Sequence, residues 1–109
     1  MAFEAICGVN LYELTPRARR DIFIIWIRIA QDSVEVADRV ETAILENCET
    51  LALLPRLGNA RPKLTHKPVL TWPTHPYENY LLVYNPETKP IRILRVIQAS
   101  RRKVWGRGI

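Results

Sequence analysis

Two apolar segments near the C-terminal end of the chain constrain its fold most strongly. Residues 80–84 read Tyr-Leu-Leu-Val-Tyr, and residues 91–97 read Ile-Arg-Ile-Leu-Arg-Val-Ile. Aliphatic, β-branched and aromatic residues of this kind favour strands, and the Asn-Pro-Glu-Thr segment at 85–88 is typical of a tight turn. The sequence therefore predicts an antiparallel pair of strands over residues 77–84 and 91–97.

Successive side chains of a strand point to opposite faces of a sheet. In the first of the two strands, Tyr80, Leu82 and Tyr84 share one face, and we expect this face to pack against helices as core. Leu81 and Val83 point to the other face. In the second strand, the same rule places four residues on one face, namely Ile91, Ile93, Arg95 and Ile97.

Two amphipathic helices are predicted in the first half of the chain. Thr15 and Pro16 mark the first helix start, because threonine is a favoured N-cap and proline fits the first helical position. Apolar residues then recur at helical spacing, at Ile22, Ile25, Trp26 and Ile29. The helix is interrupted at residues 31–33, where Asp32 and Glu35 predict a capping box for a second helix. This second helix should run as far as Pro55. Its apolar stripe consists of Ala37, Val40, Ile44, Cys48 and Leu51. These helices should form an antiparallel hairpin.

Prolines dominate the segment between 55 and 76, which can therefore hold loop and edge strand but no central strand. Its best strand candidate covers residues 69–72. With a first strand over residues 9–14, the element order is β-α-α-β-β-β. We expect an α+β fold in which a helical hairpin packs on a small, mostly antiparallel sheet. The length of 109 residues fits a single domain over 1–109.

Charge is distributed unevenly along the chain. Residues 56–109 contain eleven Lys and Arg residues against two acids, whereas residues 1–55 contain five basic and nine acidic residues. No apolar run is long enough to cross a membrane, and the N-terminus lacks a secretory signal, so we expect a cytoplasmic protein. Cys7, Cys48, His66 and His75 show no metal-ligand spacing, and we expect neither a metal nor another cofactor.

Several motifs, in order and spacing together, resemble the RelE/ParE superfamily of type II toxin–antitoxin systems, in its ParE-like branch. They are Leu-Thr-Pro-Arg-Ala at 14–18, Leu-Ala-Leu-Leu-Pro-Arg-Leu-Gly at 51–58 with Arg61, Tyr-Leu-Leu-Val-Tyr at 80–84, and Ile-Leu-Arg-Val-Ile at 93–97 followed by Gln-Ala-Ser-Arg. The resemblance covers nearly the whole chain. It implies the RelE/ParE-like fold and the toxin half of a plasmid-stabilisation pair.

The family resemblance implies two modes of action. RelE-like members are ribosome-dependent endoribonucleases that use a cluster of basic side chains on the sheet. Trp72, Thr74 and Leu81 stand at positions that match three of those basic residues, so the cluster is incomplete here. ParE-like members poison DNA gyrase by binding it, and the 51–58 motif and the 80–84 strand resemble this branch better. A non-toxic member that acts only as a binding module is a third possibility.

Candidate site residues follow from the same comparison of motifs and from charge. For target binding they are Arg61, Arg95, Arg101, Arg102 and Trp105, and for a nuclease they would be Arg61, Arg95, Arg101 and His75. Arg95 lies between apolar neighbours, so it is either a binding residue on an open sheet face or the ion-pair partner of an acid such as Glu13.

The expected partners are a cognate antitoxin, whose C-terminal segment wraps the toxin, and a target. The target is DNA gyrase in the ParE-like reading and the ribosome with its mRNA in the RelE-like alternative. A basic toxin suits an acidic antitoxin tail, because complementary charge accelerates encounter. We expect growth inhibition by this chain and no association with membranes.

Overall fold

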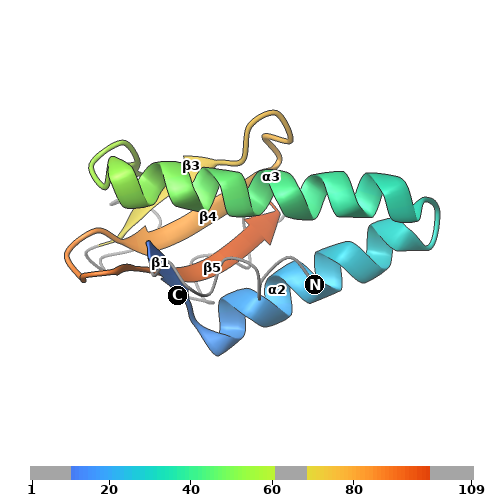
Figure 1. The fold of residues 1–109 in the computed structure, drawn as a ribbon, viewed down its shortest axis with the longest axis horizontal. Coiled ribbons are helices and arrows are strands. Elements are labelled where there is room, and N and C mark those ends of the chain that lie inside the picture. The colour runs from blue at the N-terminus through green and yellow to red at the C-terminus, as the bar shows by residue number, and fades with distance from the viewer. Residues whose placement is uncertain (1–10, 61–68, 99–109) are drawn as a thin grey trace.

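The computed structural model describes residues 11–60 and 69–98, where two helices pack on a five-stranded sheet (Figure 1). Strand β1 covers Tyr12–Leu14, helix α2 covers Pro16–Ala30 and helix α3 covers Val34–Leu53. Four strands follow: β2 (Asn59–Ala60), β3 (Leu70–Pro73), β4 (Tyr80–Asn85) and β5 (Ile91–Gln98). The predicted α+β class and β-α-α-β-β-β order are confirmed, and the two-residue strand β2 is an addition.

The sheet has the strand order β1-β5-β4-β3-β2. β1 runs parallel to β5, and the other neighbouring strands are antiparallel. The sheet is therefore mostly antiparallel, as predicted. The central β4–β5 pair is the one that the two apolar segments specify, and α3 lies across it while α2 runs beside β5 (Figure 1).

Both helices begin at hydroxyl caps. Thr15 accepts a hydrogen bond from the backbone N–H of Ala18 at 3.1 Å, and its own hydroxyl donates to the carbonyl of Leu94 at 3.0 Å, which joins the helix start to β5. For α3 the predicted capping box of Asp32 and Glu35 is wrong. Ser33 is the N-cap instead, because its extended backbone directs the hydroxyl oxygen to the N–H of Val36 at 3.2 Å.

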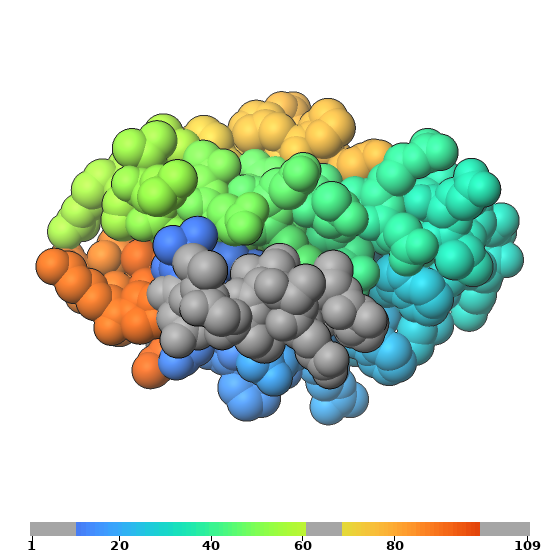
Figure 2. All heavy atoms as spheres, in the orientation of Figure 1, coloured from blue at the N-terminus to red at the C-terminus, as the bar shows by residue number. Residues whose placement is uncertain are grey.

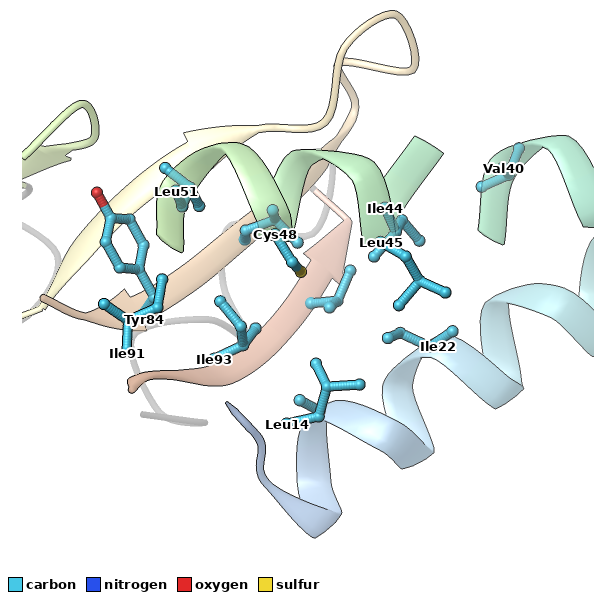
Figure 3. Packing of buried hydrophobic residues seen from close by; sticks show 13 residues of the cluster. Leu14, Ile22, Val40, Ile44, Leu45, Cys48, Leu51, Tyr84, Ile91 and Ile93 are labelled. Carbon is cyan, nitrogen blue, oxygen red and sulfur yellow. The ribbon is translucent and has the colours of Figure 1, made fainter. Parts of the chain in front are cut away.

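The main core lies between the helices and the sheet (Figure 3). Leu82 and Tyr84 are fully buried in it and Tyr80 packs against it, so the predicted core face of β4 is confirmed. Cys48 is also fully buried, and burial raises the pKa of its thiol. Trp26, which belongs to the predicted apolar stripe of α2, is only half-buried, and its indole N–H donates to Asp38 on α3 at 2.8 Å.

A β-bulge interrupts the predicted alternation of β5. Val83 pairs with Arg95 while the next residue, Tyr84, pairs with Ile93, so Leu94 is an extra residue in the strand. As a result, Ile93 and Val96 both belong to the helix-facing core, whereas Ile97 packs with a separate buried cluster. The prediction that Ile91, Ile93, Arg95 and Ile97 share one face is therefore wrong beyond the bulge.

The hydroxyl of Tyr84 fixes the turn that follows α3. It donates to the carbonyl of Pro55 at 2.7 Å and accepts from the N–H of Gly58 at 2.9 Å. A Cβ at position 58 would lie 2.6 Å from this hydroxyl and 2.9 Å from the carbonyl oxygen of Thr71, so only glycine allows the approach. Burial raises the pKa of Tyr84, which keeps the phenol protonated and able to donate.

Replacing Tyr84 by Phe should therefore destabilise the protein by about 1–2 kcal/mol, because the Pro55 carbonyl and the Gly58 N–H both lose their partner. Urea unfolding of the full chain measures this difference. Tyr80→Phe is the matched control, since the Tyr80 hydroxyl makes no hydrogen bond within the described residues. Equal stability of Tyr84→Phe and the wild type would show that the turn does not depend on this hydroxyl.

Candidate functional site

A groove of about 430 Å³ lies between α2 and the outer part of β5. Its lining combines apolar and charged side chains, among them Asp21, Ile25, Arg28, Tyr80, Arg95 and Val96. β1 pairs with β5 only at residues 91–93, so beyond that point α2 takes the place of a neighbouring strand. The groove is thus formed where a helix covers a sheet edge.

Asp21 is the residue that holds α2 at this edge. One carboxylate oxygen accepts from the Arg95 Nε at 2.7 Å and from the backbone N–H of Val96 at 3.0 Å, and the other accepts from the Arg95 Nη2 at 3.3 Å. The two side chains are only 13% and 11% exposed. The carboxylate therefore satisfies a strand N–H and neutralises a buried guanidinium at the same time.

Of the two alternatives predicted for Arg95, the ion pair with an acid is confirmed, but the acid is Asp21 and not Glu13. Glu13 instead accepts from the Nε of Arg92 at 2.8 Å, in a pair whose side chains are about half exposed. The register of the parallel β1–β5 pair explains the difference, because it places Glu13 opposite Arg92, three residues before Arg95. Arg95 has a structural role in this arrangement, and its direct contact with a target stays a prediction.

The outer surface of α2 is basic with an apolar stripe. Its four arginines are all exposed, namely Arg17, Arg19, Arg20 and Arg28, while Asp21, the sole acid of the helix, is engaged by Arg95. Phe23, Ile24 and Ile27 are exposed between them. An apolar stripe between cations for which the described residues supply no ion-pair partner suits an amphipathic segment that carries negative charge.

His75 belongs to a second polar group, at the connection between β3 and β4. Asn47 of α3 is buried and donates to the His75 carbonyl at 3.0 Å, while its oxygen accepts from the indole N–H of Trp72 and from the His75 N–H. The imidazole Nδ1 lies 2.7 Å from a carboxylate oxygen of Glu78. This arrangement orients the ring, but His75 does not line the groove that contains Arg95.

The positions that match the basic cluster of RelE-like nucleases are largely turned inward. Thr74 is completely buried, and its hydroxyl has no hydrogen-bond partner in the described part of the chain. Trp72 packs against the core, and its indole N–H donates a hydrogen bond to Asn47. Leu81 packs with the smaller cluster of Val69, Val83 and Ile97. A cation introduced at 72 or 74 would thus replace core, whereas a nuclease must present cations to its substrate.

Four of the predicted site residues, Arg61, Arg101, Arg102 and Trp105, lie outside the described residues, as do His66 and Cys7. Within residues 11–60 and 69–98, no three His, Cys, Asp or Glu side chains are grouped to hold a metal ion. No helix in those ranges has the length and apolar character needed to cross a membrane.

Two important residues, Asp21 and Asn47, were not predicted from the sequence. The sequence pattern could have indicated Asp21, because it is the one acid in a helix with four arginines. The pattern could also have indicated Asn47, because it lies three residues after Ile44 and four before Leu51, inside the buried stripe of α3. A polar residue at such a position needs a hydrogen-bond partner in the core.

Removing the Asp21 carboxylate should cost far more stability than removing that of Glu13. We expect Asp21→Ala to destabilise the protein by about 3 kcal/mol, because it leaves Arg95 and the Val96 N–H without this partner. Glu13→Ala, which opens the half-exposed pair with Arg92, should cost less than about 1 kcal/mol. Urea unfolding of both variants measures the loss in the free energy of unfolding. Similar small losses for the two variants would mean that Asp21 does not hold α2 on the sheet.

Comparison with known proteins agrees with this architecture. The family model described as "ParE toxin of type II toxin-antitoxin system, parDE" matches residues 12–103. A solved structure titled "Chromosomal ParDE TA system from P. aeruginosa" has the same fold, with a TM-score of 0.65 and 22% identity over 80% of this chain and 92% of that one. No curated protein matches in sequence. The family match spans most of the chain, including both helices and the β4–β5 pair, and the chain therefore belongs to the ParE toxin family of type II toxin–antitoxin systems.

Proposed function

We propose that this toxin arrests growth in the cytoplasm by binding DNA gyrase. The observation that carries the proposal is the inward position of Trp72 and Thr74, at two of the three positions where a RelE-like nuclease has cations. Without those cations, the developing charge of a cleaved phosphodiester lacks part of its stabilisation. Membership of the ParE family favours gyrase over the ribosome as the target.

The alternative, an mRNA endoribonuclease, is favoured by one observation. The contact between His75 and Glu78 would orient the imidazole as a general base. However, cations within reach of a phosphate are needed as well, and the interactions of His75 within the described residues are with Trp72, Asn47 and Glu78 and include no cation. We therefore rank this activity second.

We further propose that an acidic antitoxin segment neutralises the toxin by binding the outer face of α2. The exposed apolar side chains of Phe23, Ile24 and Ile27 would supply buried area, and the surrounding arginines would attract the segment. The groove beside α2 continues this surface, because Ile24 and Arg28 also line it.

Purified toxin should inhibit supercoiling by gyrase and leave mRNA on translating ribosomes intact. His75→Ala should inhibit gyrase as strongly as the wild type, because recognition does not need a general base. The two assays are run side by side on the full chain. Cleavage of mRNA by the wild type that His75→Ala abolishes, without any effect on supercoiling, would replace this proposal by the nuclease alternative.

Induction of the toxin alone should halt growth, and co-expression of the adjacent small gene should restore it. Reversing charge on α2 with Arg20→Glu and Arg28→Glu together should weaken that rescue at least about tenfold in the antitoxin dose required, since like charges then face the acidic segment. Thermal unfolding confirms that the variant is folded. Unchanged rescue would place the antitoxin elsewhere, and normal growth on induction of soluble wild type would contradict a toxin.

A further inference from the structure

A second exposed apolar surface lies at the C-terminal end of α3, and we call it the leucine turn: Leu53, Leu54 and Leu57. Leu53 is 71% exposed and Leu54 56%, and Leu57 is also exposed. Three exposed leucines within five residues of one turn are unusual, whereas single exposed apolar side chains are ordinary. The turn lies at the opposite end of α3 from the α2–α3 connection (Figures 1 and 2).

The leucine turn is held in one conformation from inside the protein. The hydroxyl of Tyr84 binds both the Pro55 carbonyl and the Gly58 N–H, and the Leu57 N–H donates to the Leu54 carbonyl at 3.1 Å. Arg56 reaches across to Glu87 in the β4–β5 turn at 2.8 Å. A surface fixed in this way loses little conformational entropy on binding, which is a property of docking sites.

The charge of the leucine turn separates it from the basic surface of α2. Arg56 is the one charged residue of the segment 53–58, and it is paired with Glu87, so this segment adds no net charge to the described surface. Nucleic acid requires unneutralised cations, and an acidic antitoxin segment gains no attraction here. The chemistry that complements three leucines and a neutral ion pair is an uncharged apolar recess on a folded protein.

We propose that the leucine turn is the surface through which this toxin docks into an apolar recess of its protein target, separate from the surface that binds the antitoxin. This inference rests on the proposed function, since it assigns a contact surface to the target of the toxin. Leu53 and Leu54 insert into the recess, while Tyr84 and Gly58 position them.

The test compares the full-length toxin with the double variant Leu53→Ser, Leu54→Ser and with the control Val34→Ser. Val34 is 53% exposed at the other end of α3, so the control removes a comparable apolar side chain away from the turn. We expect the double variant to need at least about tenfold more protein for growth arrest and supercoiling inhibition. The control should match the wild type, and both variants should keep the thermal midpoint and the antitoxin binding of the wild type.

Full toxicity of the double variant at the same soluble level overturns the inference and leaves the proposed function intact. Loss of antitoxin capture by the double variant also overturns it, because the turn would then belong to the antitoxin interface. A wild-type dimer in size-exclusion chromatography that the double variant abolishes would reassign the turn to self-association. Failure of the wild type itself to arrest growth defeats the proposed function rather than the assignment of one surface.

Discussion

The exposed surface beside α2 depends on one carboxylate, that of Asp21, which holds this helix over the edge of the sheet. Asp21 binds the Arg95 guanidinium and the Val96 N–H together, so α2 occupies the place of a further strand beside β5. This contact has two consequences. It removes an exposed strand edge, and it presents the arginines and apolar side chains of α2 outward beside a groove. The surface proposed for partner binding on this side therefore builds on an interaction that also stabilises the fold.

A similar coupling of core and surface occurs at the other end of the molecule. Tyr84 is part of the main core, yet its hydroxyl reaches the turn after α3 and fixes the backbone that carries the exposed leucines (Figure 3). The two surfaces differ in charge, one basic and one neutral. This difference suits partners of different chemistry: a toxin of a type II toxin–antitoxin system has a cognate antitoxin, and the proposed function adds a protein target.

Hydrophobic periodicity and turn chemistry were sufficient to predict the two helices, the β4–β5 pair and the helix-facing side of β4. The details of the site were less predictable, because they depend on contacts between residues far apart in the sequence. The bulge at Leu94 arises from the register between β4 and β5, and the acid that pairs with Arg95 is Asp21, 74 residues away in the sequence. Glu13 was a reasonable candidate by strand position, but the parallel pairing of β1 with β5 places it opposite Arg92.

We propose that this chain acts by recognition of a protein target and not by cleavage of RNA. The most direct measurement is the affinity of the purified, full-length toxin for purified DNA gyrase, for example by isothermal titration calorimetry. We expect saturable binding that the double substitution of Leu53 and Leu54 weakens and that Val34→Ser leaves unchanged. Absence of binding to gyrase, together with cleavage of ribosome-bound mRNA by the same preparation, would contradict it.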